Sequence, residues 1–151
     1  MRRLVTGIDA AGRSCCVERA DVHFEASVID PELARAGVYE TDQCPPPGRP
    51  AGHGVDVDTG LAPGLVRWSV IRFPPGFAYP MHHTDTIDLD LVLEGSAELV
   101  LDDGAHLLEA GDCVAVTGVD HAWRVGPQGV TMSVTTVGTP PAPDGTSVPK
   151  R

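Results

Sequence analysis

The 151 residues carry 21 acidic and 11 basic side chains, which gives a formal charge of −10. Such a surface repels nucleic-acid phosphates and anionic lipids, so the composition argues against binding to nucleic acids or membrane surfaces. Seventeen glycines and fourteen prolines separate short apolar runs, a pattern typical of many strands joined by turns in one domain.

The first twelve residues, MRRLVTGIDAAG, lack the apolar core of a secretory signal. No apolar run in the chain reaches the length of a membrane span, so a cytoplasmic protein is expected.

The N-terminal region, residues 1–43, reads as short strands with one helix. Asp30 offers an N-cap, Pro31 suits the first helical position, and Gly37 follows as a terminator. One short helix is therefore expected between them. The segments expected to be extended are 4–7, 15–18, 22–29 and 38–41.

Residues 44–64 are rich in proline and glycine and predict a long surface loop, of the kind that can cover a binding site. Residues 65–138 alternate strands with turns and predict an all-β barrel or sandwich. The whole is interpreted as one domain, 1–138, with a flexible tail at 139–151. The expected barrel strands are 65–73, 77–83, 87–93, 97–101, 106–108, 113–117, 122–125 and 130–137.

Side chains alternate across a strand, and this parity decides which groups can converge. In 87–93, Asp88 and Asp90 share one face and are expected to point into the barrel. The opposite face, which carries Ile87 and three leucines, needs cover from another sheet or a second subunit. A homodimer is therefore expected.

Three histidines are candidates for chemistry. His82 and His121 can meet only if the sheet closes, and with Asp88 they would form a 2-His-1-carboxylate site that suits Fe(II) and related divalent ions. Zinc with a bound water is the alternative. His83 points away from His82 unless the strand bulges. The competing interpretation makes His82 and His121 structural histidines and Asp88 an acceptor within its own sheet.

The segment from Gly76 through His82 and Asp88 to Gly95 resembles the first cupin motif, and Gly111-x6-Gly118-x2-His121 resembles the second. MHHTDTIDLDLVLEG is similar to the HRTDTIDY-type strings of small single-domain cupins. The resemblance implies a jelly-roll barrel, commonly dimeric, with a pocket for a metal or a small molecule. It implies a divalent metal ion (Fe, Zn, Mn or Ni) on His82, His121 and Asp88.

Four positions depart from the cupin pattern. Thr84 replaces the second histidine of the H-x-H pair, and Asp88 replaces a longer glutamate. Val116 and Val125 replace a proline and an asparagine of the second motif. His83 could substitute for the missing ligand if the strand bulges, and Thr84 could hold a metal-bound water.

The favoured function is a metal-dependent enzyme, a lyase or dehydratase, an isomerase or a cyclase, that acts on a small organic metabolite. Asp88 or His83 would move the proton. The resemblance suggests a polyketide-like or aromatic substrate, because small cupins often accompany secondary metabolism. The expected pocket residues are Trp123, Asp90, Thr84 and Trp68, with core packing as the alternative for both tryptophans.

Two alternatives remain open. The first is a non-catalytic cupin that binds or senses a small molecule through a degenerate metal site. The second is an Fe-dependent oxygenase, which requires a redox-active ion. Metal content and its dependence on His82 and His121 separate the metal enzyme from the binding protein.

Overall fold

The computed structural model describes residues 1–30, 32–48 and 52–142, and the chain is all-β over these ranges. The predicted fold class is confirmed, except for the expected short helix. The strands are β1 (Arg2–Ile8), β2 (Ser14–Asp21), β3 (Glu25–Ala26), β4 (Ala34–Arg35), β5 (Val55–Asp56), β6 (Val66–Phe73), β7 (Ala78–His83), β8 (Thr86–Leu101), β9 (Gly104–Glu109), β10 (Cys113–Val116) and β11 (His121–Gly138).

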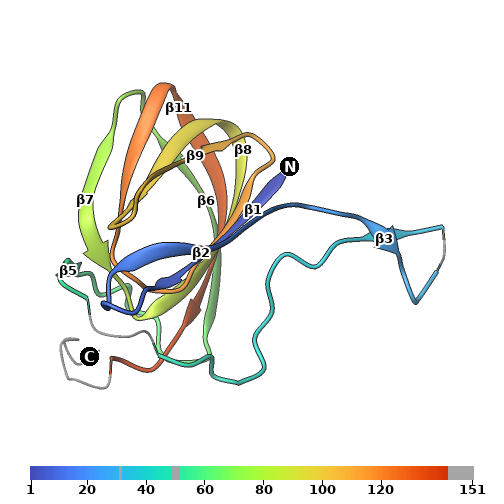
Figure 1. Ribbon diagram of the computed structural model, residues 1–151, viewed down its shortest axis with the longest axis horizontal. Helices are drawn as coiled ribbons and strands as arrows, with labels where there is room; N and C mark the ends of the chain where they lie inside the picture. The colour runs from blue at the N-terminus through green and yellow to red at the C-terminus, as the bar shows by residue number, and fades with distance from the viewer. Residues whose placement is uncertain (31, 49–51, 143–151) are drawn as a thin grey trace.

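One sheet of nine strands curls into a barrel (Figure 1). Its path runs β2-β1-β10-β8-β11-β7-β5, with β9 paired to β8 and β6 paired to β11. The long strands β8 and β11 pair antiparallel through both of their halves and bend together at Gly95 and Gly129. Gly95 has a φ of +75°, and a Cβ there would lie 2.0 Å from the carbonyl oxygen of Gly129. Only glycine permits this approach, so a bend replaces the expected turn between two strands.

The core follows the predicted alternation. Val92 of β8 is 1 % exposed, whereas its neighbour Leu93 is 44 % exposed on the outer face. Leu99, Leu108 and Met132 come from three different strands and fill the interior. Burial of this inward face drives the sheet to close on itself.

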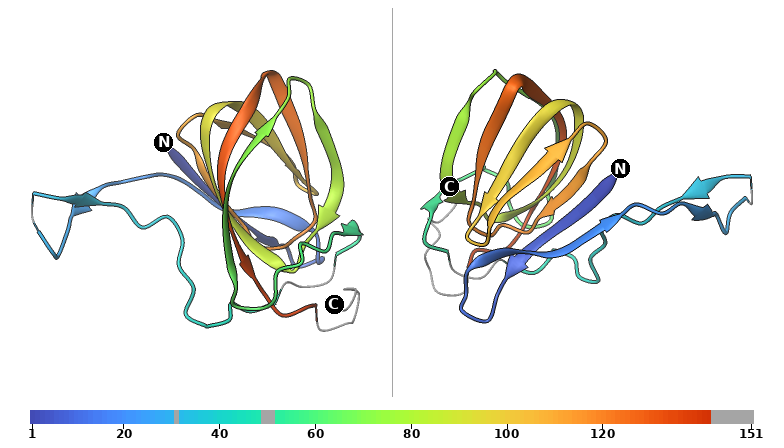
Figure 2. Two further views of the ribbon diagram at one scale, coloured as in Figure 1. Left: turned by 180° about the vertical axis from the view of Figure 1, so that it is seen from behind. Right: turned by 45° about the horizontal axis from the view of Figure 1, so that its top comes forward.

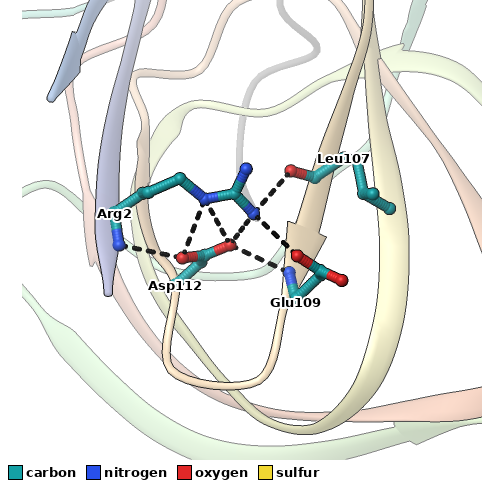
Figure 3. A network of polar contacts seen from close by, with 4 residues as sticks. All are labelled: Arg2, Leu107, Glu109 and Asp112. Carbon is teal, nitrogen blue, oxygen red and sulfur yellow. Dashed lines mark hydrogen bonds and ion pairs between the residues drawn. The ribbon is translucent and has the colours of Figure 1, made fainter. Parts of the chain in front are cut away.

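Arg2 fastens the start of β1 to the turn between β9 and β10 (Figure 3). Its backbone amide donates to Asp112 Oδ1 at 2.8 Å, and its guanidinium donates to both oxygens of that carboxylate. The backbone amide of Glu109 donates to Asp112 Oδ2 at 3.0 Å. Burial alone would raise the pKa of Asp112, but the hydrogen bonds from Arg2 and Glu109 lower it. This network holds β1 beside β10, its parallel partner.

The expected helix after Asp30 is wrong. Pro31 lies outside the described residues, and Ala34–Arg35 forms β4, which pairs with β3. These two short strands lie at the end of an arm, residues 22–30 and 32–36, that extends away from the barrel (Figures 1 and 2). A helix of six or seven residues is marginal without packing, and Leu33 is 56 % exposed here. The strand predicted over 22–29 is reduced to β3, because the rest of this segment has no strand to pair with.

Two further predictions, for the loop 44–64 and for the start of the tail, differ from the structure. The loop 44–64 contains β5, which pairs in parallel with β7, so part of the loop belongs to the sheet. The predicted tail is packed over its first residues, since Thr139 and Ala142 are 1 % and 3 % exposed. The amide of Thr139 donates to the carbonyl of Asp85, and this contact extends the ordered chain beyond β11. Residues 143–151 of the tail lie outside the described residues. No helix in the described part of the chain has the length and apolar character of a membrane span.

Candidate functional site

The structure brings His82 and His121 together where β7 ends and β11 begins. The two residues lie opposite each other in the antiparallel register, and their ring centroids are 4.1 Å apart. Both side chains are buried, at 8 % and 2 % exposure. Closure of the sheet therefore joins the two sequence motifs.

Each ring is oriented by a carbonyl two residues earlier. The Nδ1 atom of His82 lies 3.0 Å from the carbonyl oxygen of Pro80, and that of His121 lies 2.8 Å from the carbonyl oxygen of Val119. A carbonyl only accepts, so each Nδ1 carries the hydrogen and donates it. In the neutral ring this leaves the lone pair on Nε2, the arrangement found in metal-binding histidines.

Burial keeps both imidazoles neutral. It lowers the pKa of His121 to about 3, with a further lowering from the charge of His82. Burial also lowers the pKa of His82, although the carbonyls of Pro80 and His121 act in the opposite direction. Two uncharged bases therefore stand side by side at neutral pH.

The two rings line a cavity of about 320 Å³ inside the barrel. Its volume is at the small end for pockets that bind organic ligands. Apolar and aromatic side chains form much of the wall, including Phe73, Tyr79 and Trp123. A larger hollow of about 420 Å³ lies at the Gly95–Gly129 bend, but no histidine lines it. Of these two hollows, the smaller one is the one lined by His82 and His121.

Two carboxyl groups enter this cavity from β8, as the parity of the strand predicts. The Thr84 hydroxyl lies 2.7 Å from the Thr86 hydroxyl, and Thr86 donates to Asp88 Oδ1 at 3.0 Å. Burial raises the pKa of Asp88, and hydrogen bonds from Thr86 and Thr136 only partly oppose this.

Asp90 lies deeper on the same face of β8. Burial raises its pKa well above the ordinary value, and the charge of Asp88 raises it further. Its Oδ1 atom is buried and has no hydrogen-bond partner among the described residues. The carboxyl pair therefore favours retention of a proton inside the cavity.

The donor set fits a metal ion with two protein ligands. His82 and His121 supply neutral nitrogens, and a small ligand or water would complete the coordination. Within the described ranges, no group of three His, Cys, Asp or Glu side chains is placed to hold a metal. Asp88 is therefore not in place as the expected third ligand: it is one methylene shorter than glutamate and is engaged by Thr86.

The other expected site residues divide into two groups. Thr84, Asp90 and Trp123 line the cavity, as expected. Trp68 does not: it is 76 % exposed on the outer face of β6, where its Nε1 donates to Ser133 Oγ at 2.7 Å. An even-numbered residue of β6 faces outward, so strand parity explains the difference.

His83 also stays outside the cavity, because it occupies the opposite face of β7 from His82. Its Nδ1 lies 2.7 Å from Asp120 Oδ1, and its Nε2 lies 3.8 Å from Asp56 Oδ1. A proton-transfer role in the cavity is therefore not available to this ring in the observed arrangement.

Sequence reasoning missed Asp120, which anchors the loop behind the histidines. Its carboxylate accepts hydrogen bonds from the backbone amides of His53 and Gly54 and lies against His83. Burial alone would raise the pKa of Asp120, but these contacts lower it. A Cβ at Gly52 would lie 2.2 Å from Asp120 Oδ1, so the glycine is needed for this approach. The clue in the sequence that could have identified Asp120 is its position directly before His121.

Tyr79 and the loop residue Val57 were also missed. The ring of Tyr79 meets His82 edge-on, with centroids 4.6 Å apart, and Val57 lines the cavity from the loop. Strict alternation of side chains along β7 would place Tyr79 on the face opposite His82. The register between β7 and β11 shifts between His121 and Trp123, where Tyr79 pairs with Trp123.

No family model matches this sequence. The chain is 38% identical over 63 residues to phomopsin biosynthesis cluster protein C' of Diaporthe leptostromiformis, covering 41% of this chain and 33% of the relative. It is 28% identical over 127 residues to the cupin-domain-containing oxidoreductase fogC of Aspergillus ruber, covering 80% and 62%. The matches thus span less than two thirds of either relative.

A solved structure from Silicibacter pomeroyi, described as a sugar phosphate isomerase from a cupin superfamily, overlays with a TM-score of 0.43. The sequence identity is 27%, and the overlay covers 50% of this chain and 52% of that one.

Proposed function

We propose that this chain is a cupin and that it is a metal-dependent enzyme that acts on a small organic metabolite inside the barrel. One observation carries the proposal. Two neutral imidazoles, His82 and His121, lie side by side with unprotonated Nε2 atoms at the wall of a largely apolar cavity. A structural role would not require two adjacent buried rings that each direct Nδ1 to a backbone carbonyl and line the same cavity.

A divalent ion on the two imidazoles would supply Lewis acidity toward an oxygen of the substrate. The chain's own residues would orient the histidine rings, line the cavity and transfer protons. The carbonyls of Pro80 and Val119 orient the rings, and the side chains of Phe73, Tyr79 and Trp123 line the cavity beside them. Asp88, with its raised pKa, is the proposed proton donor and acceptor. This set suits dehydration, isomerisation or cyclisation.

The size and wall of the cavity support a compact, partly aromatic substrate. Phe73, Tyr79 and Trp123 offer ring faces, and Arg67 at the wall offers a positive charge to an acidic or phenolic group. Matches to proteins of fungal biosynthesis clusters support a metabolite of secondary metabolism. Relatives named as oxidoreductases support an iron-dependent oxygenase as the second enzyme candidate.

A binding or sensing cupin is the competing function. It is favoured by Thr84 at the second histidine position and by the engagement of Asp88 with Thr86. Both features leave the proposed metal with only two protein ligands.

Metal analysis of protein purified without added metal separates the two functions. We expect close to one ion per chain in the wild type and less than about a tenth of that in His82→Ala and His121→Ala, because each removes half of the protein ligands. Asp88→Asn should retain the metal, and His23→Ala, at an exposed position, is the matched control. Sub-stoichiometric metal that neither cavity histidine affects would overturn the enzyme proposal in favour of the binding protein.

A further inference from the structure

Asp90 carries a buried carboxyl group that the fold leaves without a full set of hydrogen bonds. The residue is 6 % exposed and lines the cavity, and no described residue bonds to its Oδ1 atom. A buried polar atom without a partner costs free energy, and most such atoms in proteins are satisfied. Asp88, on the same face of β8, accepts hydrogen bonds from Thr86 and Thr136. Asp90 is therefore the exception of the pair and needs a different explanation.

The side chains opposite Asp90 on the neighbouring strands cannot donate a hydrogen bond to it. These cross-strand partners are Val114 of β10 and Val134 of β11, and Val92 follows on the same face of β8. All three valines belong to the hydrophobic core. A valine at position 90 would continue this apolar surface, so packing alone does not call for an aspartate. The unpartnered oxygen indicates a partner that is not part of the chain.

The bend shared by β8 and β11 places Asp90 and His121 on different halves of the sheet. Asp90 precedes Gly95 and pairs with Val134, which follows Gly129, whereas His121 begins β11 before Gly129. Both side chains line the same cavity. A ligand that occupies the cavity therefore meets the histidine and the carboxyl group from different halves of the barrel.

The protonation of the carboxyl group decides what it recognises. Burial raises the pKa of Asp90 well above its ordinary value, and the charge of Asp88 raises it further, so the acid form is favoured. A protonated carboxyl group donates a hydrogen bond, and a carbonyl oxygen is the complementary acceptor. The Nε2 atoms of His82 and His121 are unprotonated and only accept, so they cannot take this role.

We propose that Asp90 determines ligand specificity: its carboxyl group donates a hydrogen bond to a carbonyl oxygen of an organic ligand in the cavity. The inference rests on the proposed function only in that the cavity holds a small organic molecule, and it requires no metal. A site built to hydrogen-bond a ligand rejects the analogue that lacks the oxygen, because the buried donor then stays unpaired. A cavity of about 320 Å³ with aromatic walls suits a ketone with a single ring.

Three probes with one shared skeleton test the proposal on metal-free protein: acetophenone, ethylbenzene and 1-phenylethylamine. NMR titration gives the dissociation constant of each. The wild type should bind acetophenone about tenfold more tightly than ethylbenzene, since one buried hydrogen bond is gained. Asp90→Asn, whose amide also donates, should keep this preference, whereas Asp90→Val should lose it. Asp42→Val, at an exposed position, is the matched control and should follow the wild type.

Two results would overturn the proposal. A wild type without the preference for acetophenone, or an Asp90→Val variant that retains it, would show that Asp90 is not the donor. Tighter binding of 1-phenylethylamine than of acetophenone, abolished in Asp90→Asn, would show an ionised carboxylate that selects cations. Circular dichroism of every variant verifies that the fold is retained. Metal content, measured before the metal is removed, reports on the enzymatic proposal separately, so failure of one proposal is recognised without failure of the other.

Discussion

His121→Asn is expected to make the stability of the metal-free protein less sensitive to acid. The folded pKa of about 3 lies far below the ordinary value of 6.5, so the unfolded chain takes up a proton that the folded chain refuses. Stability from this source is complete above pH 6.5 and is lost as the pH falls toward 3. Between pH 7 and pH 3.5 the wild type should lose about 4 kcal/mol more than the variant.

Urea unfolding of both proteins across this pH range gives the comparison, as the difference in free energy of unfolding at each pH. His23→Asn, at an exposed position, is the control and should follow the wild type. Parallel curves for the wild type and His121→Asn would show that the ring takes up protons freely, which contradicts its enclosure.

The wild-type curve alone does not isolate this effect, because Asp90 acts in the opposite direction. Its raised pKa keeps a proton on the folded chain after the unfolded chain has lost one. Stability therefore falls as the pH rises above 3.8, by up to about 1.4 kcal/mol per pH unit. The two linkages overlap in mildly acidic solution, and only differences between variants separate them.

Asp120→Ala is the second large expected effect. The substitution removes a buried carboxylate that accepts from the amides of His53 and Gly54 and from the ring of His83. Loss of one partner from such a buried pair costs about 3–5 kcal/mol in the free energy of unfolding. Chemical denaturation at pH 7 measures the loss.

A double-mutant cycle with His83→Ala identifies the cause. If the two side chains stabilise the fold mainly through each other, the double variant should lose much less than the sum of the single losses. Additive losses would contradict a specific pair. The pair also lies directly behind His82 and His121, so Asp120→Ala should weaken metal binding about tenfold even though it removes no ligand.

Strand parity and motif spacing predicted the centre of this site. Alternation placed Asp88 and Asp90 on the inward face of β8, and the two-motif resemblance placed His82 opposite His121. These predictions hold because burial of one face fixes the register of every residue on a strand.

The predictions that failed concern features that depend on contacts between distant segments. A local helix pattern at Asp30 could not reveal that the segment extends into an arm without a packing partner. The pairing of β5 with β7, and with it the place of Asp120, arises from a loop whose composition predicts no regular structure. Trp68 shows the limit of hydrophobicity as a guide, because a large aromatic residue lies on the outer face.

His82 and His121 are expected to present unprotonated Nε2 atoms to the cavity that both line. Nitrogen-15 NMR of histidine-labelled, metal-free protein, assigned with His82→Ala and His121→Ala, tests this expectation most directly. We expect a neutral His121 ring at pH 5, with its hydrogen on Nδ1, and a neutral His82 ring of the same tautomer at pH 7. A charged ring under these conditions, or a hydrogen on either Nε2, would contradict it.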